Sequence, residues 1–399
     1  MINLQPFIRK KELVDSTTQL VQIATENPPG NEQRAAPFLK RLLSRMGFKI
    51  KTLLSPKGRW NIVAERRWGE GGRTLIFNGH LDVVPAGDPS QWKYPPFEGK
   101  LSKGRIYGRG ASDMKSGIVS FIHAVSAIER SKTPLLQGAV ILHLVSDEES
   151  HGHHGTEFLT RTIGIQGDAA LVGEPTDLQP VIAQKGALWV RISTFGKSAH
   201  GSRPHLGVNA IEKMTNLMER LNSFLLQKEH PLLGKPTLSI GTIHGGTKIN
   251  IVPDRCEIEV DRRILPGEEK EVVLGEMKAI LDSLRSKDSL FQYRIEEIDF
   301  AEPSQVDPEE EIVRIGVQAI EEVMGKKPAL RAFSGFTDSR FYLNQYHIPT
   351  LIFGPGGVDQ SHTTDESVEV EALVRAAHIY GLIILHYLSF ERSGQKNEG

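Results

Sequence analysis

Five side chains of the kinds that bind divalent metals stand where the sequence changes from apolar to polar. They are His80, Asp113, Glu149, Glu174 and His362. Imidazole and carboxylate groups suit one divalent ion, or a pair of ions that share a bridging carboxylate. Zn²⁺ is favoured, with Co²⁺ or Mn²⁺ as alternatives, because ligand type alone does not select the metal. Cys256 is the only cysteine, so a site built from thiolates is excluded.

His80 has a candidate partner two residues later in the chain. Residues 75–77 form an apolar run, which predicts a buried strand that ends near Gly79. Because side chains alternate along an extended backbone, His80 and Asp82 would point to the same side. We therefore expect the Asp82 carboxylate to accept the second N–H of the His80 ring and so to orient this metal ligand.

Predicted strands also lead to the other metal-capable groups. Apolar runs at residues 75–77, 138–145, 169–172 and 350–353 each precede one or more of them. Helical patterns separate the runs, which indicates an α/β domain around a mainly parallel sheet. The carboxyl ends of parallel strands meet at one edge of a sheet, where open α/β folds bind their ligands. Asp113 would join this edge from the start of the helix that follows it.

The pattern changes between residues 182 and 300. Strand-like and helical segments follow one another there in the order βαββαβ. That order is typical of a ferredoxin-like module, in which two helices cover one face of an antiparallel sheet. We therefore predict one domain in two parts, residues 1–181 and 301–399, with an α+β domain inserted at 182–300. Cys256 falls on a strand of the inserted domain and is expected to fill its core.

The composition favours a protein that acts on small molecules. The 399 residues include 48 Lys and Arg against 49 Asp and Glu, which gives no support for binding nucleic acid or a membrane surface. The first residues show no apolar signal core, and no apolar run approaches the roughly 20 residues that span a bilayer. We expect a soluble protein of the cytoplasm.

Several motifs, in this order along the chain, resemble those of one enzyme family. They are Gly79-His80-Leu81-Asp82, Gly108-Arg109-Gly110-Ala111-Ser112-Asp113-Met114-Lys115, Asp147-Glu148-Glu149, Gly173-Glu174-Pro175 and Ser361-His362-Thr363. The chain resembles, over nearly its whole length, the metallohydrolases that include acetylornithine deacetylase, succinyl-diaminopimelate desuccinylase, aminoacylase and carboxypeptidases, the M20-type peptidases. The resemblance implies a di-metal catalytic domain with an inserted lid or dimerisation domain.

By this resemblance, two metal ions would have separate ligand sets that share one carboxylate. Asp113 would bridge the ions, and His80 and Glu174 would complete the first site. Glu149 and His362 would complete the second site.

The same resemblance makes Asp82 the residue that orients His80 and makes Glu148 the general base. Glu148 would accept a proton from water as that water attacks an amide carbonyl, and would then pass the proton to the leaving amine. Adjacent side chains on an extended backbone point to opposite sides, so Glu149 can bind metal while Glu148 faces the substrate.

Further roles follow from the resemblance in the inserted domain and beyond it. His200, within residues 198–204, would hydrogen-bond the tetrahedral oxyanion in the active site of a neighbouring subunit, so the protein would work as a homodimer. Asn250, Arg263 and Arg340 match family positions that make them candidates for binding a substrate carboxylate. An exposed turn and solvated arginines are the simpler alternatives.

We expect a metal-dependent amidohydrolase that removes an N-acyl group from a small amino acid or amine. N-acetylornithine and N-succinyl-diaminopimelate head the candidate substrates. Relatives of the family also cleave dipeptides, the C-terminal glutamate of folates or N-formylated aminopyrimidines, and the sequence does not choose among them. The alternative from another class is a catalytically silent protein that binds a ligand through its metal. Such a protein would be expected to lack the base, and Glu148 is present.

Other histidines have simpler explanations. His151, His153 and His154 follow the acidic triplet and are expected to be loop residues, with a third metal site as the alternative. His123 lies in a helical pattern and His143 in an apolar run, so both are expected to pack in the core.

Overall fold

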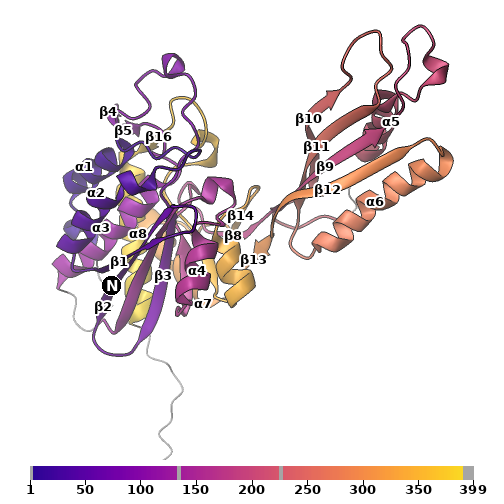
Figure 1. The fold of residues 1–399 in the computed structure, drawn as a ribbon. Coiled ribbons are helices and arrows are strands. Elements are labelled where there is room, and N and C mark those ends of the chain that lie inside the picture. The colour runs from indigo at the N-terminus through magenta and orange to yellow at the C-terminus, as the bar shows by residue number, and fades with distance from the viewer. Residues whose placement is uncertain (1–2, 133–135, 224–227, 390–399) are drawn as a thin grey trace, which may run out of the picture. The chain divides into compact units, whose positions relative to one another are not determined.

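The chain forms two compact units in a computed structural model that describes residues 3–132, 136–223 and 228–389. Unit 1 consists of Met1–Ile182, Val306–Arg331 and Thr337–Gly399. Unit 2 consists of Ala183–Gln305 and Ala332–Phe336. Figure 1 labels the helices and strands of both units.

Most strands of a large sheet belong to unit 1. Its strand order is β1-β2-β6-β3-β7-β15-β8-β13, and β14 pairs with β8. The strands are β1 (Lys49–Leu54), β2 (Trp60–Trp68), β3 (Arg73–His80), β6 (Gly138–Val145), β7 (Ala169–Val172), β8 (Val181–Gln184), β13 (Ser304–Gln305), β14 (Arg331–Phe333) and β15 (Thr350–Ile352). A small antiparallel sheet adds β4 (Lys100–Ser102), β5 (Arg105–Tyr107) and β16 (Ser367–Glu369).

The centre of the large sheet is parallel. Strands β6, β3, β7 and β15 all run in one direction, whereas β1, β2 and β8 pair antiparallel at the two sides. Every residue of β7 and β15 is buried, which is why these strands are continuous apolar runs. The prediction of a mainly parallel α/β sheet is confirmed.

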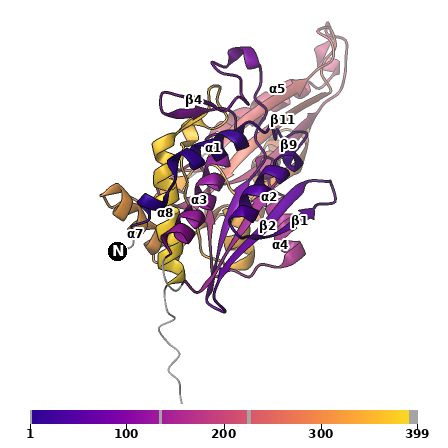
Figure 2. The same ribbon diagram turned by 90° about the vertical axis from the view of Figure 1, so that its left-hand side faces the viewer.

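Helices cover the sheet of unit 1. They are α1 (Lys10–Val21), α2 (Ala36–Arg45), α3 (Lys115–Ser131), α4 (Thr156–Ile163), α7 (Glu311–Met324) and α8 (Val370–Leu388). Figure 2 shows α1, α3 and α8 close together, and α3 contacts both of the others. The rings of Phe77, Phe121, Phe353 and Tyr380 meet where α3 and α8 pack on the central strands, with centroids 4.2–5.6 Å apart. This aromatic cluster fixes the two helices against the strands that end at the site.

Unit 2 has its own sheet and core. Strands β9 (Gly186–Phe195), β10 (Thr237–Gly245), β11 (Arg255–Ile264) and β12 (Gln292–Ala301) form an antiparallel sheet in the order β10-β11-β9-β12. Helix α5 (Ala210–Ser223) lies between β9 and β10 in the chain, and α6 (Lys270–Lys287) lies between β11 and β12. The predicted βαββαβ order of a ferredoxin-like module is confirmed.

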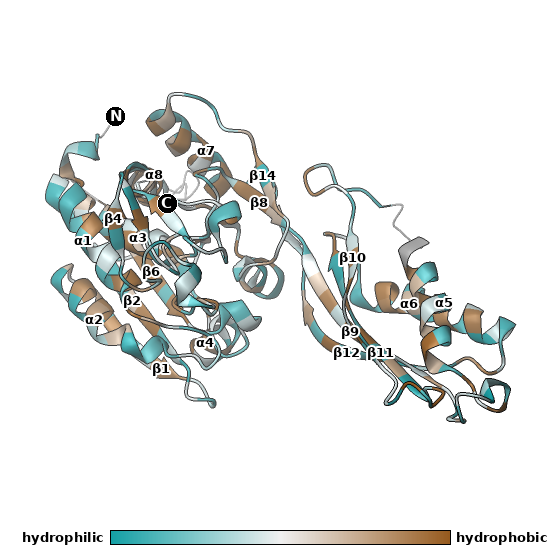
Figure 3. Ribbon diagram, turned by 90° about the horizontal axis from the view of Figure 1, so that it is seen from above, coloured by the Kyte–Doolittle hydropathy of each residue, from teal (hydrophilic) through white to brown (hydrophobic). Residues whose placement is uncertain are grey.

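Unit 2 is hydrophobic on only one face of its sheet. Along β11, buried Cys256, Ile258 and Val260 alternate with more exposed residues and join the core that α5 and α6 complete. Figure 3 shows hydrophobic and hydrophilic residues interspersed on both helices, as expected for helices that cover a sheet. The expectation that Cys256 fills this core is confirmed. In the described part of the chain, no helix is long and apolar enough to cross a membrane.

The two core histidines are packed as expected. Nε2 of His123 lies 3.1 Å from Oγ of Ser16, and Nδ1 of His143 lies 2.8 Å from the hydroxyl of Tyr342. Burial lowers the pKa of His123 to about 4 and that of His143 to about 3. Between these values and about 6.5, the unfolded chain binds protons that the folded protein does not. Stability is therefore lost as the pH falls through this range.

We predict that His123→Gln makes the protein less sensitive to acid. Glutamine can keep a hydrogen bond with Ser16 but cannot take up a proton, so it removes a loss on the order of 3 kcal/mol at pH 4. Urea denaturation of the chelator-treated protein between pH 7 and pH 4 measures this. A control variant, His205→Gln, changes an exposed ring and should keep the wild-type pH dependence. If the free energy of unfolding of wild type and His123→Gln fell equally with pH, protonation of His123 would not contribute to the loss of stability in acid.

Candidate metal centre

The central strands bring the predicted metal ligands together. His80 is the last residue of β3, Glu149 follows β6 and Glu174 follows β7. His362 comes from the segment after β15, and Asp113 lies just before α3. Because the four strands are parallel, their carboxyl ends lie at the same edge of the sheet.

Asp113 lies between the two imidazoles. Its Oδ1 is 3.0 Å from Nε2 of His80, and its Oδ2 is 3.5 Å from Nε2 of His362. Glu149 Oε2 approaches His362 Nε2 to 3.0 Å. Glu174 Oε2 lies 3.9 Å from His80 Nε2. One carboxylate therefore faces both histidines, which is the arrangement required of a bridging ligand.

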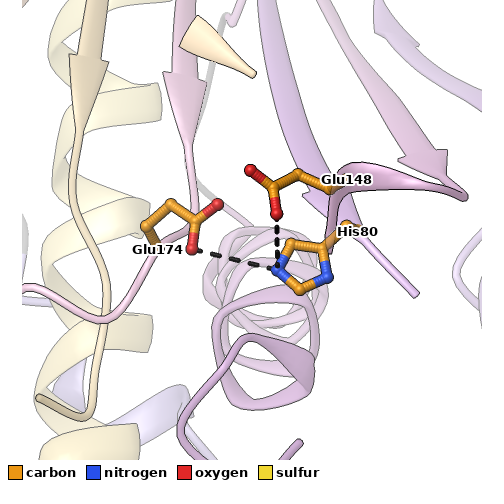
Figure 4. Close-up of side chains that lie close together, drawn as sticks. All are labelled: His80, Glu148 and Glu174. Carbon is orange, nitrogen blue, oxygen red and sulfur yellow. Dashed lines mark ion pairs between the residues drawn. The ribbon is translucent and has the colours of Figure 1, made fainter. Parts of the chain in front are cut away.

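Glu148 also lies beside His80. Its Oε2 is 4.0 Å from Nε2 of His80, and Figure 4 shows Glu148 and Glu174 both pointing toward that ring. The described part of the chain contains two groups of side chains whose potential ligand atoms all lie within 4.8 Å of one another within the group. They are His80, Glu148 and Glu174, and His80, Asp113 and Glu149.

Asp82 contacts different groups from those expected. The hydrogen-bond partner of His80 Nδ1 is the backbone carbonyl of Asp82, at 2.8 Å, whereas the carboxylate is 3.8 Å away. The carboxylate instead accepts from the backbone N–H groups of Glu148 and Glu149, each at 3.2 Å, and from Nδ2 of Asn27 at 2.9 Å. Asp82 therefore orients His80 through its main chain and holds the loop after β6 through its side chain.

Two residues that the sequence analysis missed hold Asp113 in place. Oε1 of the buried Glu366 accepts from the backbone N–H groups of Ser112 at 2.8 Å and Asp113 at 3.0 Å. Arg109 binds Oε2 of Glu366 at 2.6 Å and also donates to the carbonyl of Thr363 at 3.2 Å. The segment that carries Asp113 is thus tied to the segment that carries His362.

Asp338 is a third missed residue. It is fully buried, its Oδ2 accepts from Thr156 Oγ1 at 2.6 Å, and its charge contributes to raising the pKa of both Glu148 and Glu174. Thr156 also contacts Nδ2 of Asn78 at 2.7 Å. Its hydrogen-bond partner Thr156 lies 182 positions away in the sequence, so no local pattern marks this contact.

The electrostatics of the site favour a bound cation. Burial, followed by nearby carboxylates, raises the pKa of Glu148 and Glu174 well above the usual value. Burial lowers the pKa of His80, but Asp113, Glu174 and Glu148 together raise it well above its usual value. Carboxylates thus outnumber imidazoles among these largely buried side chains. A divalent cation would supply the missing positive charge, and this donor set fits one.

Arg340 lies in unit 1, and its guanidinium group hydrogen-bonds to backbone carbonyls. It is buried and donates to the carbonyl of Thr337 at 2.8 Å and to that of His151 at 2.5 Å. Its role in binding a substrate carboxylate stays a prediction. His151 and His153 belong to neither potential ligand set of the described residues, and Nδ1 of His153 lies 2.5 Å from Glu157.

The other predicted site residues lie in unit 2. His200 is exposed, and its Nδ1 lies 2.7 Å from Oγ of Ser202. Asn250 is exposed, and Arg263 forms an ion pair with Asp261 at 2.9 Å. Their roles stay predictions.

Comparison with known proteins identifies the class. Residues 76–386 match the model of peptidase family M20/M25/M40. The chain is 31% identical to succinyl-diaminopimelate desuccinylase of Paracoccus denitrificans, over 94% of this chain and 97% of that protein. It is 30% identical to acetylornithine deacetylase of Edwardsiella ictaluri, over 90% and 91%. An M20 family metallo-carboxypeptidase from Sulfolobus solfataricus shares the fold, with a TM-score of 0.80 at 19% identity, over 95% of this chain and 100% of that one.

The chain belongs to peptidase family M20/M25/M40. It is a metal-dependent hydrolase of amide bonds, as the sequence motifs predicted.

We predict that divalent metal raises the thermal midpoint of the chelator-treated protein by several degrees. A ligand that binds only the folded state adds about 2.7 kcal/mol at 100 times its dissociation constant. Asp113→Asn should remove most of the rise, because the amide is a neutral replacement for the bridging carboxylate. Asp15→Asn changes an exposed acid paired with Lys11 and should keep the rise. An equal rise in the wild type and Asp113→Asn would argue against this site.

Proposed function

We propose that the protein removes an N-acyl group from an amino acid, as a deacetylase or desuccinylase of its family. The observation that carries the proposal is the position of Asp113 between His80 and His362, with Glu148 beside the same centre. The relative that matches 94% of the chain is named a desuccinylase, and the one that matches 90% is named a deacetylase. Both names support this substrate class.

We propose two ions per subunit, most consistent with Zn²⁺, with Co²⁺ or Mn²⁺ as substitutes. His80 and Glu174 would hold one ion, Glu149 and His362 would hold the other, and Asp113 would bridge them. Bound divalent ions would polarise the amide carbonyl and would lower the pKa of bound water toward neutral pH. The mixture of imidazole and carboxylate donors supports Zn²⁺ over Mg²⁺ or Ca²⁺, which prefer oxygen alone.

The proposed general base is Glu148. Its Oε2 lies 4.0 Å from Nε2 of His80, beside the proposed centre, where it can accept a proton from water and return one to the leaving amine. Asp82 holds the backbone N–H of Glu148 at 3.2 Å and so limits the movement of this side chain. Glu149 and Glu148 divide two tasks between neighbouring residues, metal binding and proton transfer.

The remaining roles in the proposal fall to three residues of unit 2 and to one residue of unit 1. His200 would donate a hydrogen bond to the oxyanion in the active site of a neighbouring subunit of a homodimer. Its exposure and its contact with Ser202 support this, because the ring is both accessible and oriented. Asn250, Arg263 and Arg340 are the candidates for binding a substrate carboxylate. A cytoplasmic location stays a prediction that rests on the sequence.

A dipeptidase or carboxypeptidase activity is the second candidate. The solved metallo-carboxypeptidase shares the fold of this chain, although its low identity does not transfer its substrate. A deformylase acting on aminopyrimidines belongs to the same group of alternatives. A silent binding protein is disfavoured by the presence of a buried Glu148 beside His80.

We predict that the Zn²⁺-loaded protein hydrolyses an N-acyl amino acid faster than any dipeptide. The panel comprises N-acetylornithine, N-succinyl-diaminopimelate, dipeptides, a folate-type glutamate conjugate and an N-formyl aminopyrimidine. Release of free amine is measured with and without chelator, and the chelator should abolish it. Preference for a dipeptide would establish the second candidate, and no release from any substrate despite bound metal would favour a binding protein.

We predict that Glu148→Gln keeps bound metal and lowers kcat by about 100- to 10,000-fold, because the amide cannot accept the proton. Metal content and kcat are measured on the same preparation. Glu149→Gln is the matched neighbour: it should lower the metal content, because Glu149 is a proposed ligand. Near-normal turnover by Glu148→Gln would remove Glu148 from the role of base.

A further inference from the structure

A buried arginine lies behind the loop that carries Glu148, where no role has been assigned to it. Arg59 precedes β2 and is 9% exposed. Its Nη1 binds Oδ1 of Asp147 at 2.7 Å, and its Nε binds Oε2 of Glu32 at 3.1 Å. Its Nη2 also binds Glu32, which is fully buried. The guanidinium group therefore bridges two buried carboxylates, of which one is the direct neighbour of Glu148.

Asp147 is the anchor of that loop. Its Oδ2 accepts from the backbone N–H of His154 at 3.0 Å, and its carbonyl accepts from Gly152 at 2.6 Å and Ser150 at 3.1 Å. Its φ of +69° lies in the left-handed region, which disfavours most side chains. Arg59 thus binds the residue on which the fold of the loop depends.

The segment before α2 is shaped to hold the arginine. Gly30 has a φ of +86°, and a Cβ atom there would overlap the guanidinium group of Arg59. Asn27, from the same segment, donates to Asp82 at 2.9 Å and to Ser150 Oγ at 3.1 Å. This segment therefore contacts the Glu148 loop directly through Asn27 and indirectly through Glu32 and Arg59.

We propose that Arg59 is a positioning residue for Glu148: with Glu32 it fixes Asp147, and through Asp147 it fixes the loop that presents Glu148 and Glu149 to the metal centre. The effect on turnover rests on the proposed function, whereas the effect on the loop does not. A planar guanidinium group is required, because it binds Glu32 through two nitrogens and still has a third for Asp147. The Lys ammonium group cannot reproduce this geometry.

The main test compares Asp147→Asn and Arg59→Gln with wild type. Asp147→Asn is nearly isosteric and tolerates positive φ, so it weakens the contact with Arg59 while keeping the fold. We expect kcat at saturating Zn²⁺ to fall about 10- to 100-fold in both variants, with KM within about twofold of wild type. Amide hydrogen exchange of residues 147–154 should become faster in both, whatever the substrate.

A double variant separates positioning from stability. Replacing a buried ion pair by apolar residues often restores stability. Glu32→Leu/Arg59→Met should therefore regain most of the thermal midpoint lost in Arg59→Met alone, while kcat stays low and exchange in residues 147–154 stays fast. Recovery of kcat together with the midpoint would overturn the proposal, because Arg59 would then act only on stability.

Arg66→Gln is the matched control. Arg66 lies on β2 and forms an ion pair with Glu129 at 2.8 Å. This variant should keep kcat and the slow exchange of residues 147–154. Unchanged exchange in both Asp147→Asn and Arg59→Gln would overturn the proposal. If the wild type turns over no substrate of the panel, the proposed function fails, and the exchange experiment still decides whether Arg59 holds the loop.

Discussion

The structure of unit 1 depends on keeping four carboxylates close together at one edge of a sheet. Asp113, Glu148, Glu149 and Glu174 share this space with the imidazoles of His80 and His362. Burying charge without compensation is costly, and the raised pKa of Glu148 and Glu174 expresses that cost. A divalent cation offsets it, so the same repulsion that destabilises the empty centre contributes to its affinity for metal. The surrounding fold must therefore prevent these side chains from moving apart.

At two places, a buried carboxylate holds a loop of the site by accepting from two successive backbone N–H groups. The carboxylate of Asp82 accepts from the successive backbone N–H groups of Glu148 and Glu149. The carboxylate of Glu366 accepts in the same way from Ser112 and Asp113. A donor side chain fixes each carboxylate in turn, Asn27 for Asp82 and Arg109 for Glu366. The ligand loops are thus held through their main chains, which leaves the ligand side chains free to face the metal.

The sequence was sufficient to predict the sheet and to single out candidate ligands, because both depend on local patterns. Mainly apolar runs marked the buried parts of β3, β6, β7 and β15, and parallel strands carry the residues after them to one edge. The supporting contacts were not predictable. Arg59 meets Asp147 across 88 positions, and Glu366 meets Asp113 across 253, with no periodicity to mark either pair.

Asp82 shows what the alternation of side chains along a strand can and cannot predict. Alternation along the backbone correctly placed this residue near His80, yet it could not tell the carbonyl oxygen from the carboxylate. That choice depended on which backbone N–H groups the loop after β6 brings to the carboxylate, and so on tertiary structure. Local patterns therefore pointed to candidate site residues, whereas the hydrogen bonds that orient them depend on the folded chain.

The loops at the metal centre also carry backbone strain. Asp147, His151 and His362 have φ values of +69°, +71° and +62°. A left-handed conformation costs roughly 1–2 kcal/mol for most residues, although Asp and His are among the types that tolerate it best. The hydrogen bonds to the carbonyl of Asp147 and the ion pair with Arg59 offset this cost. Contacts within the chain therefore support the left-handed backbone at Asp147, and the same contacts hold the neighbouring Glu148 and Glu149 at the centre.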